Sequence, residues 1–324
     1  MTSLPLSVVD LPPQDVLSQR FHLITGKGGV GKSTVAMTLG LYWASRGIKT
    51  LICEVDDREM MTRAFQVEPS KSEIRSLQDR LFAVSIDTQS ALSEYGALKL
   101  RVKAFSKLLT DNPVTRALIS IVPGVADLIA LGKAFNHERE RDSQGRPLWD
   151  RVIIDAPSTG HGLTFLRLPQ VIREVVPSGN MRREADEMWS LLSDPTRSAI
   201  HVVTTPEELP CQEAAELWQA LRAEANLTPQ CLWINQVVLP CLTDQEWEAF
   251  SERALTSDMH LWIEVLKRRH LRAASAVDSL ELLKSIQGPR AHLPLFSTSK
   301  IVDLKDHLVR AIRERGEELT HGKS

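Results

Sequence analysis

Two lysines lie within a glycine-rich stretch near the start of the chain, where they can neutralise the charge of a triphosphate. The stretch follows the apolar run 21–25 and opens into the apolar run 35–44, which is typical of a buried helix. Strand, glycine-rich turn and helix form the context in which the pattern G-x-x-x-x-G-K-[ST] cradles phosphate groups. We therefore expect a nucleoside triphosphate to bind to nine consecutive residues: Gly26, Lys27, Gly28, Gly29, Val30, Gly31, Lys32, Ser33 and Thr34.

The polar side chains of this loop have separate expected roles. Lys32 is placed for the β- and γ-phosphates, and the Ser33 hydroxyl is placed for Mg²⁺. Lys27 directly follows the first glycine and adds a cation that a single triphosphate does not normally require from its own loop. It is either an exposed loop lysine without a special role or a group with a second function.

A candidate catalytic carboxylate, Asp56, stands at the end of the apolar run 50–55. A carboxylate at that place can face the γ-phosphate and orient the attacking water. The alternative is that Asp56, or Asp57 beside it, caps the following helix. We favour the catalytic role for Asp56.

A second aspartate, Asp155, ends the apolar run 151–154 and is expected to hold Mg²⁺, through a water or through the Ser33 hydroxyl. The loop after it carries Gly160 and His161 and is expected to change shape with the γ-phosphate. His161 is either a general base or a residue that positions this switch. The positioning role is favoured, because phosphoryl transfer asks the protein mainly for geometry and electrostatics.

The elements that must position these residues are short apolar runs that alternate with helical stretches. Such continuous runs indicate strands covered on both faces, and therefore an α/β fold with a mostly parallel sheet flanked by helices. Function in such a sheet gathers at the carboxyl ends of the strands. The predicted strands are residues 21–25, 50–55, 81–86, 151–154, 199–204 and 230–235.

One domain is expected over residues 20–320, after a flexible arm at residues 1–19 that carries three prolines. Helix-like periodicity predicts a helical insertion at about residues 88–143, following the third strand, and a second helical piece at about 178–196. The basic run 267–272 is interpreted as the solvated face of a helix.

Composition narrows the class of protein. The chain has 324 residues, 43% hydrophobic and 25% charged, with a net charge of −2, and no stretch of 18 apolar residues or signal-peptide pattern. We therefore expect a cytoplasmic protein, with peripheral attachment to the inner membrane face left open, and no nucleic-acid partner. Cys53 lies in an apolar run and is interpreted as a buried hydrophobe. Cys211 and Cys241 leave a soft-metal site open.

The sequence Lys27-Gly28-Gly29-Val30-Gly31-Lys32-Ser33 resembles the deviant Walker A motif of the MinD, ParA, nitrogenase-reductase and ArsA ATPases. In that group the first lysine reaches across a dimer interface to the phosphates bound by the other subunit. The resemblance therefore implies a nucleotide-sandwiched dimer in which Lys27 acts in trans, as an arginine finger does elsewhere. The implied catalytic residues are Lys27, Lys32 and Asp56.

Further motifs are similar to those of the ArsA family of arsenite-pump ATPases and targeting factors for tail-anchored membrane proteins. They are the stretch 155–169, which resembles the family's switch II, the Pro-Glu-Glu segment at 206–208, and Trp233-Ile234-Asn235-Gln236. In the family the strand-end asparagine reads adenine, and an Asn amide can pair with adenine N6 and N7 in a way guanine cannot satisfy. The stretch 292–296 resembles the loop that packs on the base, which implies base contacts by Pro294 and Leu295.

The chain also departs from the better-studied members of that family. The Glu-Val-Asp form at 54–56 is similar to a less-studied bacterial branch, and the C-x-x-C that clamps the targeting-factor dimer through zinc is missing from residues 236–290. The resemblance implies a Mg²⁺-ATP-dependent dimeric ATPase, as a homodimer or with a paralogue, that captures or transfers a client. The client is an anion or metalloid, or a hydrophobic membrane-protein segment. The alternatives are a MinD/ParA-like spatial organiser and a slowly hydrolysing partner subunit.

Overall fold

The computed structural model describes residues 9–55, 59–86, 125–157, 162–175, 177–238, 243, 245–247, 260–296, 298 and 300–321. At the centre of this part of the chain lies a sheet in the order β3-β4-β2-β5-β1-β6-β7-β8. Its strands are β1 (Phe21–Gly26), β2 (Thr50–Glu54), β3 (Arg75–Gln78), β4 (Leu81–Ser85), β5 (Arg151–Asp155), β6 (Ser198–Thr204), β7 (Cys231–Val237) and β8 (Arg290–Pro294).

All neighbouring strands are parallel except β3 and β4, which are antiparallel. The predicted α/β fold class is confirmed, and each of the six apolar runs that predicted a strand forms one. The strand β3 was not predicted, because at this edge of the sheet only one of its four residues is buried and the sequence has no apolar run.

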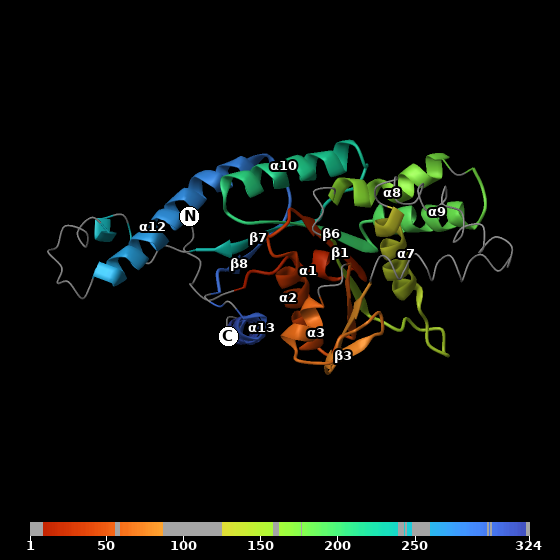
Figure 1. Ribbon diagram of the computed structural model, residues 1–324, viewed down its shortest axis with the longest axis horizontal. Coiled ribbons are helices and arrows are strands. Elements are labelled where there is room, and N and C mark those ends of the chain that lie inside the picture. The colour runs from red at the N-terminus through yellow and green to blue at the C-terminus, as the bar shows by residue number, and fades with distance from the viewer. Residues whose placement is uncertain are drawn as a thin grey trace.

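Two layers of helices cover the two faces of the sheet (Figure 1). The helices α1, α2, α3 and α13 bury residues such as Trp43 and Met61 against one face. The helices α7, α8, α9 and α10 bury residues such as Phe165 and Trp218 against the other. The bounds of these helices are α1 (Gln14–Leu17), α2 (Lys32–Ala44), α3 (Met60–Ala64), α7 (Val125–Arg139), α8 (Gly162–Val175), α9 (Asn180–Leu192), α10 (Glu208–Ala223) and α13 (Ile301–His321).

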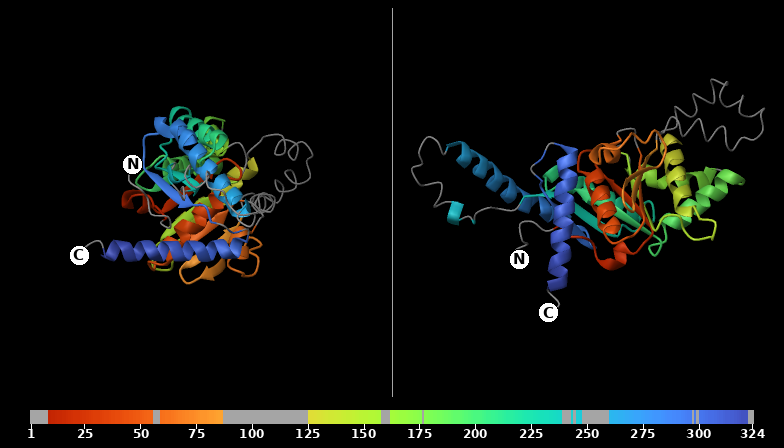
Figure 2. Two further views of the ribbon diagram at one scale, coloured as in Figure 1. Left: turned by 90° about the vertical axis from the view of Figure 1, so that its left-hand side faces the viewer. Right: turned by 90° about the horizontal axis from the view of Figure 1, so that it is seen from below.

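One further helix, α12 (His260–Glu281), extends away from the sheet and its two helical layers (Figure 2). Its C-terminal part and the following 3₁₀ turn, Leu282–Ser285, contact α10, whereas most of its first half is exposed. No helix in the described ranges is both long enough and apolar enough to span a membrane.

The N-terminal segment corrects the expectation of a flexible arm. From residue 9 onward the segment is part of the fold, because Val9 is fully buried and Asp10 pairs with His292 of β8 through two backbone hydrogen bonds of 3.0 and 2.9 Å. Val16 and Leu17 of α1 are buried as well. The three prolines of this segment suggested a flexible chain, but its apolar residues are buried at the β8 edge of the sheet. Residues 1–8 lie outside the described ranges.

The predicted helical pieces are placed only in part. Within the expected insertion at 88–143, the helix α7 spans Val125–Arg139, and residues 88–124 lie outside the described ranges. The helix α9 spans Asn180–Leu192, inside the stretch 178–196.

Two histidines form a directional hydrogen-bond chain in the buried centre of the sheet. Trp233 Nε1 donates to His201 Nδ1 at 3.1 Å, His201 Nε2 lies 3.0 Å from His22 Nδ1, and His22 Nε2 lies 2.8 Å from the Gln19 carbonyl. Because an indole nitrogen only donates, His201 Nδ1 must accept, which places the His201 proton on Nε2 and, in turn, the His22 proton on Nε2. Both imidazoles are therefore neutral.

Candidate functional site

The phosphate-binding loop leaves the sheet at the carboxyl end of β1, between β5 and β6. Gly26 is opposite Val203 of β6, and its φ of +147° carries the chain into the turn. A Cβ atom at Gly26 would lie 2.4 Å from the Val203 carbonyl oxygen, so a side chain cannot be accommodated there. This close approach gives the first glycine of the motif a structural cause.

The side chain of Lys32, at the start of α2, folds back into the loop. Its Nζ donates to the carbonyls of Gly26 at 3.2 Å and Lys27 at 3.1 Å, and the residue is 5% exposed. Gly31 precedes it in the left-handed region with φ of +89° and caps the helix without a side chain. The loop therefore combines a buried ammonium group with a helix N-terminus, which is a favourable setting for an anion. Ser33 and Thr34, in the first turn of α2, are half-buried.

Asn235, near the end of β7, is built into the wall of this loop. The residue is 3% exposed, and its Nδ2 donates to the Val30 carbonyl at 2.8 Å. A Cβ atom at Gly31 would lie 2.0 Å from that nitrogen, so Gly31 and Asn235 fit only as a pair. The amide keeps a second hydrogen and its oxygen, which is the donor and acceptor set that adenine requires. That Asn235 reads adenine stays a prediction.

The other predicted base contacts lie at the same edge of the sheet. The Leu295 backbone N–H donates to the Val237 carbonyl at 3.0 Å, and Pro294 is in register with Val237, two residues after Asn235. Leu295 is 38% exposed. Gln236 has a φ of +58°, and the β7–β8 register shifts at this point. Such bulge-like irregularities of strand pairing are common beside active sites, because they change the direction of the neighbouring side chains.

Lys27 lies in a different environment from Lys32. Its side chain is 46% exposed, and its Nζ forms an ion pair with Glu213 Oε1 of α10. The two lysines of one loop therefore diverge, since Lys32 occupies the interior and Lys27 lies toward the neighbouring helix. No local pattern in the sequence links Lys27 to Glu213, because the two residues are 186 positions apart.

Two acidic side chains are buried next to each other in register at the ends of β2 and β5. Asp155 is 8% exposed and is opposite Glu54, which is 2% exposed. Glu54 accepts hydrogen bonds from the Met61 backbone N–H at 3.2 Å with each of its oxygens, and so links the end of β2 to the start of α3. The predicted residues Asp56, Gly160 and His161 lie outside the described ranges.

A basic side chain joins the far helix α12 to this edge of the sheet. Arg272 Nη2 lies 3.3 Å from Glu207 Oε1 and 3.5 Å from Gln236 Oε1. The run 267–272 is mostly exposed, as expected for a solvated face, but Arg272 makes specific contacts. Its partner Glu207 belongs to the Pro-Glu-Glu segment, which is the only sign of this contact in the sequence.

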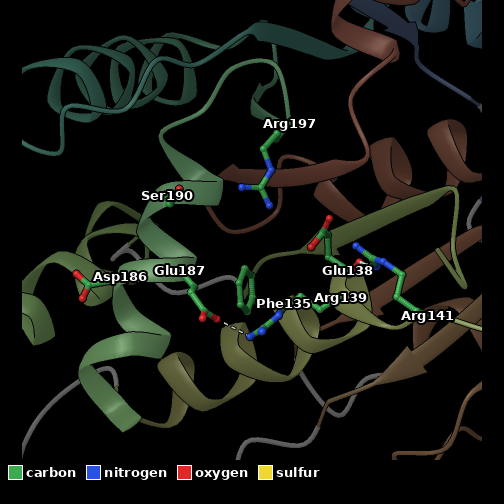
Figure 3. A pocket seen from close by; sticks show the side chains of 8 residues that line it. All are labelled: Phe135, Glu138, Arg139, Arg141, Asp186, Glu187, Ser190 and Arg197. Carbon is green, nitrogen blue, oxygen red and sulfur yellow. Dashed lines mark hydrogen bonds and ion pairs between the residues drawn. The ribbon is translucent and has the colours of Figure 1, made fainter. Parts of the chain in front are cut away.

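A cavity of about 420 Å³ lies elsewhere, between α7 and α9 (Figure 3). Its lining includes Arg197, which directly precedes β6, and Glu138, which pairs with Arg20 just before β1 at 3.0 Å. The cavity is thus at the amino ends of the strands, opposite the glycine-rich loop. Its carboxylates already have cationic partners: Glu187 pairs with Arg139 (Figure 3), and Asp186 pairs with Arg173 and Arg182. We do not assign the nucleotide to it.

The cysteines within the described ranges are buried and free: Cys53, Cys211 and Cys231. Burial raises the pKa of the Cys53 and Cys231 thiols, so neither is a thiolate at neutral pH. The interpretation of Cys53 as a buried hydrophobe is confirmed. Among the residues that the structure describes, no group of three His, Cys, Asp or Glu side chains is arranged to hold a metal ion. Cys241 lies outside them.

The fold and this loop define the class of P-loop nucleoside triphosphatases. The model of the anion-transporting ATPase family matches residues 19–182, just over half of the chain. The chain therefore belongs to this family, and it is an ATP hydrolase.

Curated relatives agree with this assignment. ATPase BagA of Mycobacterium tuberculosis is 28% identical over 251 residues, which cover 76% of this chain and 73% of the relative. An arsenical pump-driving ATPase of Acidiphilium multivorum is 26% identical over 234 residues, 67% of this chain and 39% of the relative. ATPase GET3 of Lachancea thermotolerans is 26% identical over 167 residues, 49% of this chain and 47% of the relative.

Proposed function

We propose that this chain is a Mg²⁺-ATP-dependent dimeric ATPase in which Lys27 of each subunit acts at the phosphates of the other. The divergence of the two loop lysines carries this proposal. Lys32 is buried in the loop and serves the phosphates of its own subunit, while Lys27 is half exposed and lies outside the loop interior. A cation in that position can serve a second nucleotide without competing with Lys32.

The donor set fits the magnesium ion that accompanies ATP in such enzymes. Ser33 offers a hydroxyl at the start of α2 and Asp155 a carboxylate at the end of β5, and oxygen ligands are those that Mg²⁺ prefers. The ion would neutralise charge on the phosphates. Ser33 and Asp155 would hold this ion, Lys32 would bind the phosphates, and Asp56 would orient the attacking water.

The client is proposed to be a hydrophobic segment. Among the described residues, three of the large apolar side chains that are more than half exposed lie on α12: Val265, Leu271 and Val277. Their spacing of six residues distributes them around the helix, so packing one side of α12 against α10 cannot cover them all. A nonpolar dye should bind better with ATP than without it under this hypothesis. Stimulation of turnover by arsenite, without any dye binding, would favour an anionic client instead.

The trans role of Lys27 is tested by mixing two inactive variants. Lys27→Ala alone should lose turnover by about 10²- to 10³-fold, the usual effect of removing one group that stabilises transition-state charge, while each subunit still binds ATP. Asp56→Asn alone should also lose turnover. In a mixed dimer, the site on the Lys27→Ala chain keeps its own Asp56 and receives Lys27 from its partner. With random pairing of equal amounts, about a quarter of the wild-type turnover should return.

The matched control replaces the second chain by the double variant Lys27→Ala, Asp56→Asn, which offers no intact Lys27. That mixture should stay inactive. If the first mixture is equally inactive although mixed dimers are detected by mass, Lys27 does not act in trans.

A further inference from the structure

We propose that Glu213 is a positioning residue for Lys27: it holds the Lys27 ammonium group within its own subunit until the phosphates of a second subunit take its place. This inference rests on the proposed function, because it assumes that Lys27 has a destination across a dimer interface. It assigns a role to α10 that neither the loop motif nor the family comparison contains.

The ion pair is the first support. Lys27 Nζ contacts Glu213 Oε1, and the two side chains are 46% and 25% exposed. The pair is therefore partly solvated, and exposed pairs of this kind contribute little to stability. An interaction that is weak and accessible is suited to being exchanged, whereas a fully buried pair would be costly to break.

The surroundings of Glu213 are the second support. Its other oxygen, Oε2, is buried and has no hydrogen-bond partner within the described part of the chain. Within the described part of the chain, Lys27 is thus the partner that the Glu213 carboxylate contacts, and Glu213 does not belong to a larger network of surface ion pairs. By comparison Glu216, one turn along the same helix, is exposed and accepts a hydrogen bond from Gln212 at 3.1 Å.

The rigidity of α10 is the third support. Cys211, Ala214 and Trp218 are buried against the sheet, so the helix presents Glu213 from a fixed position. Glu207 directly precedes the same helix and forms an ion pair with Arg272 of α12. A lysine that leaves Glu213 is attracted more strongly by a triphosphate than by a single carboxylate, because the charge is several times larger.

The test is the substitution Glu213→Gln, which keeps the shape of the side chain and removes its charge. The dissociation constant of the dimer is measured by analytical ultracentrifugation with Mg²⁺ and the slowly hydrolysed analogue adenylyl imidodiphosphate. Each released pair should tighten the dimer about 1.5- to 5-fold, as expected for an exposed ion pair, and the two pairs of a dimer multiply to about 2- to 25-fold. Glu213→Asp should lie closer to the wild type, because it keeps the charge.

Two controls separate this effect from a general change of charge. Glu216→Gln removes the same charge from the same helix and should leave the dimer constant unchanged. In a Lys27→Ala background, Glu213→Gln should have no effect on the constant. An unchanged or weaker dimer for Glu213→Gln, or equal tightening with and without Lys27, overturns the inference.

A second measurement does not depend on the dimer. In single subunits without nucleotide, reductive methylation of Lys27, followed by mass spectrometry, should be faster in Glu213→Gln than in the wild type. No increase overturns the inference, even if the mixing experiment establishes the trans role. Faster methylation with no dimer at any nucleotide concentration keeps the in-subunit contact and refutes the proposed dimer instead.

Discussion

Acidification should destabilise this protein through the buried histidine chain. Burial lowers the pKa of His201 from 6.5 to about 3, and burial together with the neighbouring His201 and the charge of Arg151 lowers the pKa of His22. Trp233 adds to this effect, because a proton on His201 Nδ1 would face the indole N–H donor. Both histidines therefore stay neutral in the folded chain at pH values where the unfolded chain already protonates them.

The direction of the pH effect on stability follows from the number of protons that the folded and unfolded chains bind. Below pH 6.5 the unfolded chain protonates His201 and the folded chain does not, so the free energy of unfolding falls as the pH falls from about 6.5 toward 3. Between pH 7.5 and 5 this single group costs about 2 kcal/mol of a total stability that is typically ~5–15 kcal/mol. His22 acts in the same direction. Acidic groups with lowered pKa, such as Asp186 and Asp194, lose their contribution only at lower pH.

Urea unfolding followed by tryptophan fluorescence at pH 7.5, 6 and 5 measures this effect. The variant His201→Gln keeps an acceptor for Trp233 and a donor for His22 but does not titrate, so its loss of stability over this range should be smaller than that of the wild type by about 2 kcal/mol. Equal losses in the two proteins would refute the reasoning. If the variant does not fold, the ¹⁵N shifts of the wild-type imidazoles still report the tautomers, and a proton on Nδ1 of His201 contradicts the chain.

Three further predictions concern the nucleotide site. Gly29→Ala and Gly31→Ala both place a side chain at positive φ, at a cost of about 1–2 kcal/mol, but only Gly31→Ala also meets Asn235, so its thermal unfolding temperature should fall further; equal shifts would contradict the described packing. Asn235→Ala should reduce the preference for ATP over GTP by about 1–3 kcal/mol in calorimetry, and an unchanged preference would remove Asn235 from the base site. Lys32→Ala should weaken ATP binding itself, whereas Asp56→Asn should leave binding nearly intact and lower turnover; wild-type turnover in Asp56→Asn would exclude Asp56 as the catalytic carboxylate.

The sequence by itself determined the fold class and the location of the nucleotide loop. Runs such as 152–154 are apolar without interruption, and this pattern is typical of a strand covered on both faces. The glycine, lysine and serine spacing at 26–34 is a local code, because a phosphate cradle is made by consecutive backbone groups. Prediction from local sequence fails where the composition is ambiguous. In the N-terminal segment the prolines indicated a flexible chain, but the segment packs on the edge of β8.

Only the tertiary structure decided which residues far apart in the sequence contact one another, at the loop and in the centre of the sheet. Glu213 reaches Lys27 across 186 positions, Asn235 reaches Val30 across 205, and His22 reaches His201 across 179. Each pair is brought together by the strand order, which puts β6 and β7 on one side of β1 although α3, β4 and β5 intervene in the chain. An isolated Glu, Asn or His carries no sign of its partner, because hydrogen bonds and ion pairs depend on positions in space that are fixed only when the whole sheet has formed.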